Sequence, residues 1–372
     1  MKVLGSKTIF RDGEYNAFPN LARLKDGRVI CAFRHAKDRQ AEYGACTHID
    51  PTARDVFIVS EDDGACFDPR MHVIVDDAMS EQDPCVNVLS DGRIIVTYFR
   101  WDLCPKGEGA QRWGEANFRA FGRTLWDKYD CFTDGVSYSI SDDGGATWKA
   151  FPPLKMEGMP ASGGVRGNIV ELPSGELLLP IYGSLRAGEL SRCGLLHSWD
   201  QGDSWAYLSE MAYDPAGEKT FLEPGLYRTP SGRLVGLMRT QTDYRRPGVR
   251  FDDTYLNLHI AVSEDDGRSF GPVQEIDGLW GSSPFHALRL RDDRVLLTYG
   301  YRRPPYGIRA RVCDPELLHI ADSGEIVLRD DGPNGDLGYP NAIQRRDGTV
   351  LVAYYISAPD GVRTIDVTLL GE

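Results

Sequence analysis

The sequence lacks several features that mark other classes of protein. None of its eight cysteines forms a CxxC pair, and no run reaches the ~18 apolar residues that a membrane span needs. The first residues, MKVLGSKTIF, lack the long apolar core of a signal peptide. We therefore expect free thiols, no zinc site, no membrane span and a cytoplasmic location.

An excess of positive charge is also missing. Lys and Arg number 42 against 55 Asp and Glu, so the formal net charge is −13. A chain this acidic is a poor general binder of nucleic acids or anionic membranes, and we expect neither as a partner. An anionic small substrate fits only where arginines cluster locally. The sequence holds no P-loop, Rossmann glycine fingerprint or HExxH motif, and we expect no metal and no cofactor.

The chain does contain a repeat. Each copy has a short apolar stretch, a DG, SG or DD turn, and a second stretch rich in Leu and β-branched residues. This pattern is typical of a two-stranded hairpin. The six copies occupy residues 14–29, 84–100, 167–183, 223–239, 284–300 and 339–355.

A second motif, S-x-D-x-G-x-x-W/F, is interleaved with the first. Its Asp accepts backbone N–H bonds within a turn, its Gly takes up positive φ, and its Trp or Phe packs back onto the sheet. Each copy has too few carboxylates for a calcium loop. The four copies occupy residues 60–67, 141–148, 198–205 and 263–270.

Together the two motifs predict an all-β fold. Six units with one early hairpin each, four of them with the later motif, predict a six-bladed β-propeller of four-stranded antiparallel blades. We expect the N-terminal segment to supply a strand that closes the ring onto the last blade. No linker or shift in composition interrupts the pattern, which predicts a single domain over residues 1–372.

The long segments between strands are expected on the face opposite the DG turns. They are polar and contain aromatic residues, as binding sites do. In the segment from 100 to 133, the aromatic residues form either a sugar-stacking surface or a small core beneath the loop. The four segments run from Arg34 to Arg54, Arg100 to Thr133, Thr240 to Thr254 and Tyr301 to Gly307.

The repeated S-x-D-x-G-x-x-W/F motif, over essentially the whole chain, resembles the sialidase (neuraminidase) superfamily. The resemblance implies a glycoside hydrolase that acts on an acidic, carboxylate-bearing sugar. It gives Tyr339, in LGYPNAIQ, the role of nucleophile and Glu223, in LEPGLYRTPSGRLVGLMRT, the role of its base. Arg239 and Arg309 (or Arg311, two residues on) match arginines that bind the sugar's carboxylate.

The acid/base aspartate of the superfamily lies in the loop after the second strand of the first blade. Here that loop reads FRHAKDRQAEYGACTHIDPTARD, and the resemblance does not choose between Asp38 and Asp50. An Asp before Pro, as at position 50, is also a common turn former. His35 and His48 stand in the same segment as candidate substrate-binding residues.

One position departs from the superfamily's pattern. An Arg usually precedes the apolar-Pro pair of the first blade, but YNAFP (residues 15–19) has Ala17 there. Losing this contact removes a charge-assisted bond of about 1.5–3 kcal/mol. Either another cation replaces the Arg, or the substrate is not an ordinary sialoside. The replacement candidates are Arg34, Arg166 and Arg302, and Tyr15 and Asn16 join the candidate substrate-binding residues.

Two other functions fit the same residues. A lyase acting on a uronate-containing glycan would use a Tyr or His to abstract the proton α to a carboxylate. Tyr15, His35 and His48 favour that alternative. A non-catalytic glycan-binding propeller would follow if Tyr339 and Glu223 lay apart. His286, which opens the fifth hairpin, is expected to be structural.

Overall fold

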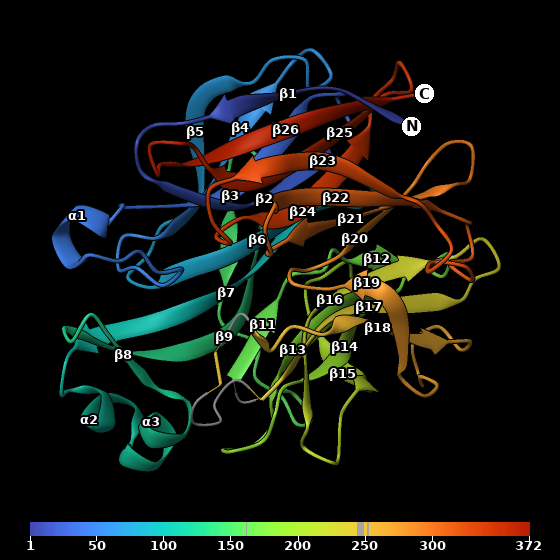
Figure 1. Cartoon of the computed structure of the whole chain (residues 1–372). Coiled ribbons are helices and arrows are strands. Elements are labelled where there is room, and N and C mark those ends of the chain that lie inside the picture. The colour runs from blue at the N-terminus through green and yellow to red at the C-terminus, as the bar shows by residue number, and fades with distance from the viewer. Residues whose placement is uncertain (161, 244–248, 251–252) are drawn as a thin grey trace.

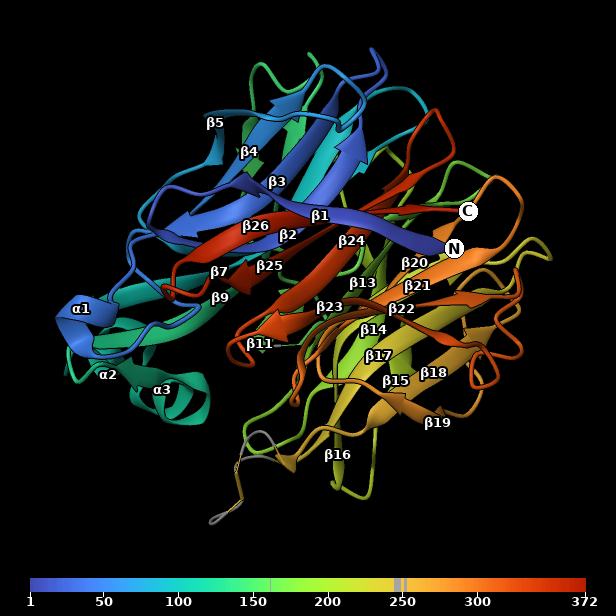
Figure 2. The same ribbon diagram turned by 45° about the horizontal axis from the view of Figure 1, so that its top comes forward.

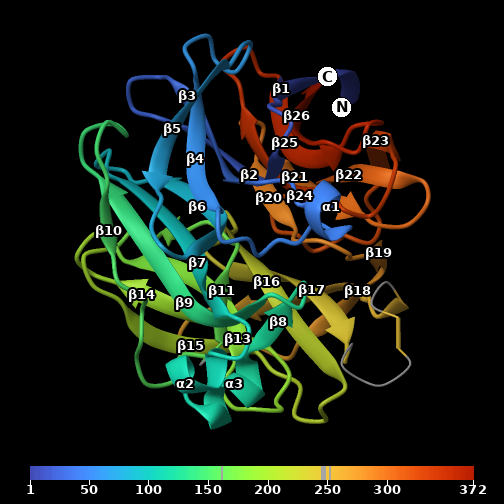
Figure 3. The same ribbon diagram turned by 90° about the vertical axis from the view of Figure 1, so that its left-hand side faces the viewer.

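The computed structural model describes residues 1–160, 162–243, 249–250 and 253–372. Its strands form five hydrogen-bonded sheets, which follow one another around a common centre in Figure 3, and nearly all of their strand pairs are antiparallel. The fold of the described chain is therefore an all-β, propeller-like arrangement of four-stranded blades. None of the described helices is long and apolar enough to span a bilayer.

The largest sheet contains both ends of the chain. Its two four-stranded halves meet at one parallel pair, Tyr15 opposite Arg363. β1 runs along β26 from Lys2 opposite Gly371 to Phe10 opposite Ile365, which confirms the expected pairing of the N-terminal segment with the last strands (Figure 2). The halves are β1 (Lys2–Phe10), β24 (Gly338–Gln344), β25 (Val350–Ser357) and β26 (Arg363–Gly371), then β2 (Tyr15–Arg23), β3 (Val29–Ala36), β4 (Arg54–Ser60) and β5 (Asp68–Val75).

The other four sheets each contain one of the hairpins expected from the repeat. The second and third sheets carry an additional short strand, β8 and β12 respectively. The second sheet has β6 (Ser80–Val88), β7 (Ile94–Pro105), β8 (Arg123–Leu125), β9 (Tyr129–Ser141) and β10 (Lys149–Phe151), and the third has β11 (Ser162–Val165), β12 (Val170–Glu171), β13 (Leu177–Ser184), β14 (Arg192–Ser198) and β15 (Ala206–Ala212). The last two have β16 (Lys219–Arg228), β17 (Leu234–Thr242), β18 (Asn257–Ser263) and β19 (Gln274–Trp280), then β20 (His286–Arg289), β21 (Val295–Tyr301), β22 (Tyr306–Cys313) and β23 (Glu325–Gly332).

The hydrophobic core lies between neighbouring sheets. Inner strands such as β3 and β13 are buried on both faces, so their sequences read as nearly continuous apolar runs rather than alternating ones. Ile30 and Phe57 of the first sheet share one cluster with Val96 and Tyr98 of the second. Burial between sheets therefore holds each blade against the next.

The four S-x-D-x-G turns share one hydrogen-bond pattern. In each, the Ser hydroxyl donates to the Asp carboxylate at 2.8 Å. The Gly N–H donates to the Ser oxygen, and the N–H four residues after the Asp donates to that carboxylate. The closing Trp148 packs edge-on against Phe57, and Trp205 against Tyr138, each on a neighbouring sheet. The turns thus tie adjacent sheets together.

Three short helices interrupt segments for which the repeat predicted only loops. They are α1 (Gln40–Tyr43), α2 (Gly109–Trp113) and α3 (Glu115–Phe121), and all three lie on the left in Figure 1. Helices this short are below the length at which the local sequence stabilises a helix, and none of the three has a side-chain hydrogen bond at its N-cap. The sequence pattern therefore did not predict them. Trp113 stacks on Phe118 and Phe132, so these half-buried rings pack against one another beside the helices.

A polar cavity of about 200 Å³ lies where the first strands of the sheets converge. Three asparagines (Asn20, Asn168 and Asn341) line it and bond one another across the ring. His286 closes the set: its Nε2 donates to the carbonyl of Ala342, and its Nδ1 accepts from Asn341. Burial lowers the pKa of His286 to about 4, so the ring is neutral at pH 7. This agrees with the structural role expected for it.

We expect Asp265→Ala to lower the free energy of unfolding by about 1 kcal/mol, because it removes the acceptor for Ser269 and Ser263 in one turn. Hydrogen bonds from Ser269 are the main cause that lowers the pKa of Asp265 to about 2. Its stabilisation is therefore present at neutral pH and is lost as the pH falls towards 2. Urea unfolding measures the effect. The exposed neighbour Glu264 provides the control, and an equal loss in Glu264→Ala would contradict the prediction.

We expect His286 to destabilise the fold in acid. Between pH 6.5, the ordinary value, and about pH 4, the unfolded chain binds a proton that the folded chain does not, so stability falls as the pH falls. In His286→Gln, the free energy of unfolding should change by about 1–3 kcal/mol less over this pH range than in the wild type. The measurement is the free energy of unfolding as a function of pH in both proteins, and parallel profiles would contradict the prediction.

Candidate active site

Four residues, one each on β2, β6, β16 and β24, have a backbone conformation that residues other than glycine rarely adopt. Phe18, Asp83, Glu223 and Tyr339 have φ of 60°, 59°, 47° and 51°, and each directly precedes a proline. The strand pairing shifts at each of these steps, as at a β-bulge. Such a conformation costs about 1–3 kcal/mol per residue, and a bulge re-aims the side chain it carries. The result is a set of side chains from four strands that meet at one place.

Tyr339 and Glu223 form the centre of this set. The Tyr339 hydroxyl donates to Glu223 Oε1 at 2.5 Å, and Arg239 donates to Glu223 Oε2 at 2.8 Å. Arg239 also lies 3.4 Å from the Tyr339 hydroxyl. Burial, together with the negative charges of Glu223 and Asp83, raises the pKa of Tyr339 well above its usual value. The phenol is therefore neutral, and the residue beside it is a proton acceptor.

Two further arginines surround Tyr339. The guanidinium of Arg302 lies 5.5 Å from the ring centroid and donates to the Tyr355 hydroxyl at 3.2 Å. Arg166 lies 5.1 Å from the same centroid and donates to the Tyr339 carbonyl at 2.9 Å. With Arg239, these side chains place three cations around one phenol.

Arg309, which the resemblance placed near Tyr339, lies elsewhere in the structure. It sits within β22, donates to the carbonyls of Pro305 and Arg329, and pairs with Glu325 at 3.4 Å. Arg311 also bonds carbonyls away from Tyr339. Arg302 immediately follows β21, the second strand of its hairpin, and Arg239 lies within β17, the second strand of its own.

Ala17 is fully buried and lies directly opposite Arg34 in the β2–β3 pair. Arg34 is itself 0% exposed, and none of its three guanidinium nitrogens has a hydrogen-bond partner within the described residues. Burial lowers the pKa of Arg34, while the nearby Tyr15, Asp50, Asp55 and Asp83 raise it. The cation adjacent to the missing arginine therefore occupies a buried polar space.

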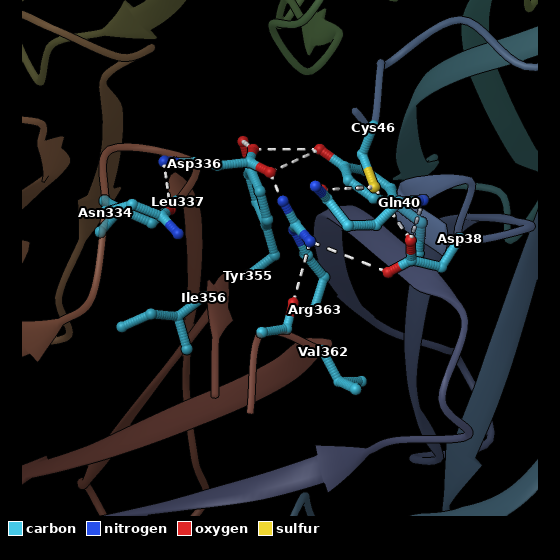
Figure 4. Close-up of polar contacts among 12 residues, drawn as sticks. Asp38, Gln40, Cys46, Asn334, Asp336, Leu337, Tyr355, Ile356, Val362 and Arg363 are labelled. Carbon is cyan, nitrogen blue, oxygen red and sulfur yellow. Dashed lines mark hydrogen bonds and ion pairs between the residues drawn. The ribbon is translucent and has the colours of Figure 1, made fainter. Parts of the chain in front are cut away.

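Asp336 is a second centre beside the first. Its carboxylate accepts hydrogen bonds from the Tyr355 hydroxyl at 3.1 Å and from Arg363 Nε at 3.0 Å; Figure 4 shows these three residues. The Tyr15 hydroxyl also donates to it, at 3.0 Å. Nε2 of His48 lies 3.3 Å from Oδ1. Although burial opposes it, the bonds from His48 and the charge of Arg363 hold the pKa of Asp336 far below its usual value. Asp336 belongs to no repeated motif, so no pattern in the sequence identified this residue.

Neither candidate acid/base aspartate contacts Tyr339. Asp50 is 1% exposed and accepts from Arg39 at 3.0 Å and from the Thr52 N–H at 2.8 Å, as a turn former does. Asp38 accepts from the Gln40 N–H at 2.7 Å and from the Cys46 thiol at 3.0 Å, beside Arg363 in Figure 4.

The remaining candidates separate into two groups. Tyr15 belongs to the Asp336 centre. His35 and Asn16 instead bond Asp12, with His35 Nε2 2.7 Å from Oδ2 and Asn16 donating to Oδ1 at 3.0 Å. Burial alone would raise the pKa of Asp12. The hydrogen bonds from His35, Asn16 and the backbone of Glu14 outweigh burial and lower this pKa to about 2. Phe18 was not among the predicted site residues, although it precedes a proline as Glu223 and Tyr339 do, and that shared X-Pro step could have identified it.

Comparison with known proteins found a matching family model and similar solved structures. The model of the BNR repeat-like domain matches residues 109–352. A protein of unknown function from Dyadobacter fermentans is 30% identical with a TM-score of 0.85, over 99% of this chain and 98% of that one. A search of the curated proteins found no match.

Two other solved structures share the fold at low identity. The leech intramolecular trans-sialidase, solved with 2,7-anhydro-Neu5Ac, is 14% identical with a TM-score of 0.67, over 99% of this chain and 70% of that one. The Penicillium chrysogenum alpha-L-arabinanase, solved with arabinobiose, is 11% identical with a TM-score of 0.66, over 100% and 98%. These two likenesses concern the fold, and the family match over residues 109–352 leads to one conclusion: the chain belongs to the BNR repeat-like domain family.

Proposed function

We propose that the protein is an exo-acting glycoside hydrolase for a sugar that carries a carboxylate. The observation that carries the proposal is the 2.5 Å hydrogen bond from the Tyr339 hydroxyl to Glu223, buried and bridged by Arg239. A phenol with a raised pKa is a poor nucleophile unless a neighbouring base takes its proton as it attacks. Glu223 stands where that base is needed.

The charges around Tyr339 suit an acidic sugar. Arg239 and Arg302 would bind the substrate's carboxylate, and Arg302 would take the role that the resemblance implies for Arg309. A neutral phenol approaches a carbon next to a carboxylate without the repulsion that an anionic nucleophile would meet. Arg166 would hold the Tyr339 backbone in place through its bond to the carbonyl. Sialidases share this use of Tyr in place of a second carboxylate.

The same proposal covers the finer features of the fold. Counting each half of the eight-stranded sheet as one blade gives a six-bladed propeller, in a single domain over residues 1–372. The shared parallel pair between Tyr15 and Arg363 supports two blades rather than one continuous sheet. The common bonding pattern of the four S-x-D-x-G turns supports their assignment as Asp boxes.

A lyase acting on a uronate-containing glycan is the second candidate. The observation that favours it is the set of Tyr15, His48 and Asp336, which puts a phenol and an imidazole on one carboxylate. A non-catalytic binding propeller loses its main support, because Tyr339 and Glu223 are in direct contact.

We expect Tyr339→Phe to lower kcat by at least about a thousandfold, because it removes the nucleophilic oxygen. Turnover is measured on aryl glycosides of sialic acid and of glucuronic acid. Tyr299→Phe is the matched control, since Tyr299 is also buried and donates to a carboxylate, that of Glu325 at 2.6 Å, away from the site.

Two outcomes of this assay would overturn the hydrolase. One is full activity in Tyr339→Phe. The other is a product whose new double bond absorbs in the ultraviolet, which would identify the lyase instead.

We expect Arg302→Lys to raise KM for a carboxylate-bearing substrate by tenfold or more, because Lys cannot make the bidentate contact. The companion Arg309→Lys should leave KM close to that of the wild type, since Arg309 pairs with Glu325. Steady-state kinetics on both variants distinguishes the two arginines, and the reverse ranking would restore Arg309 to the site.

A further inference from the structure

We propose that His48, oriented by Asp336, is the general acid/base of this site, in place of an aspartate. The inference rests on the proposed hydrolase and adds the residue that protonates the leaving group. His48 lies in the loop from which the superfamily supplies its acid/base residue. Four observations support it, and each concerns the side chains around Tyr339.

The aspartates of that loop have other partners. Asp50 is almost fully buried, and its carboxylate is occupied by Arg39 and the Thr52 turn. Asp38 accepts hydrogen bonds from the start of α1 and from Cys46. A proton donor must reach a glycosidic oxygen, and neither carboxylate is placed next to Tyr339 or the rings that contact it.

His48 is placed among those rings. Its imidazole meets the Phe18 ring edge-on at 4.8 Å and lies 6.1 Å from the Tyr15 ring, measured between centroids. Its side chain is 34% exposed, so an incoming glycan can reach it. Imidazole is also the side chain that takes up and releases a proton near neutral pH.

Asp336 gives His48 a defined orientation. Nε2 faces Asp336 at 3.3 Å, and within the described residues no side chain bonds Nδ1. The carboxylate is held in turn by Tyr15, Tyr355 and Arg363, so it cannot follow the imidazole if the ring rotates. An ionised carboxylate on one ring nitrogen stabilises the imidazolium and leaves the other nitrogen for proton transfer. Asp336 is thus a positioning residue.

Phe18 connects the two groups. Its ring centroid lies 4.6 Å from that of Tyr339 and 4.8 Å from that of His48, so both side chains contact the same aromatic ring. Phe18 reaches this position through its left-handed backbone, which brings the proposed acid/base residue and the proposed nucleophile to the same part of the site.

The two chemical steps balance. In the first, the Tyr339 oxygen bonds the anomeric carbon, its proton passes to Glu223, the glycosidic C–O bond breaks, and imidazolium His48 gives its proton to the leaving oxygen. In the second, neutral His48 takes a proton from water, whose oxygen bonds the anomeric carbon. The Tyr339–carbon bond breaks, and Glu223 returns the proton to the phenol. The sum is hydrolysis with retained configuration.

The leaving group provides the test, because a good leaving group needs no proton. We expect His48→Gln to lower kcat/KM about a hundredfold or more for methyl glycosides of sialic or glucuronic acid, but less than about tenfold for the 4-nitrophenyl glycosides. Asp336→Asn should give a weaker loss with the same selectivity. Asp38→Asn is the comparator, and it should change both substrates alike. Thermal unfolding checks that each variant is folded.

The outcomes distinguish a failure of the His48 proposal from a failure of the proposed hydrolase. If His48→Gln loses both substrates equally, or if Asp38→Asn loses the methyl glycosides selectively, His48 is not the acid and the hydrolase stands. A wild-type protein that cleaves none of these glycosides overturns both. A wild-type protein that is active, together with an inactive Tyr339→Phe and a leaving-group-selective His48→Gln, supports both.

Discussion

The left-handed backbone at the X-Pro steps is the constraint on which the candidate site depends. An extended strand would direct Glu223 and Tyr339 to a face of their own sheets, where each would pack against a neighbouring sheet. A residue with positive φ before a proline interrupts the strand and turns the side chain towards the centre. The free energy that this backbone costs is offset by burial between the sheets, and the contact between Tyr339 and Glu223 is its consequence.

Burial then decides the charge state of the groups at the centre. Glu223 is buried, but Arg239 donates to it and Tyr339 donates to its other oxygen, so its negative charge is compensated. The same burial keeps the phenol neutral. Under the proposed function, such a site would keep the nucleophile protonated beside the base that activates it. The positive charge of the surrounding arginines would then attract the substrate's carboxylate.

The departure at Ala17 has a structural counterpart on the next strand. Where the resemblance leads one to expect an arginine, the chain has a methyl group, and Arg34 lies directly across the pair. Its guanidinium shares a buried space with Asp55 and Asp83, whose oxygens also lack hydrogen-bond partners within the described residues. Burial raises the pKa of Asp55 well above its usual value. This polar space differs from the single arginine that the resemblance leads one to expect at position 17.

The sequence alone determined the hairpins and the four S-x-D-x-G turns, because these rest on local patterns. The grouping of Tyr339 with Glu223 and Arg239 was implied by the resemblance to a known superfamily and not by any local pattern. The sequence did not determine the other partners. Arg302 rather than Arg309 approaches Tyr339, and Asp336 collects Tyr15, Tyr355, His48 and Arg363. Those residues lie up to several hundred positions apart in the chain, within segments that carry no repeat. Only the closure of the sheets around a centre brings them together, since contacts between loops depend on the whole fold and leave no periodic signal in the sequence.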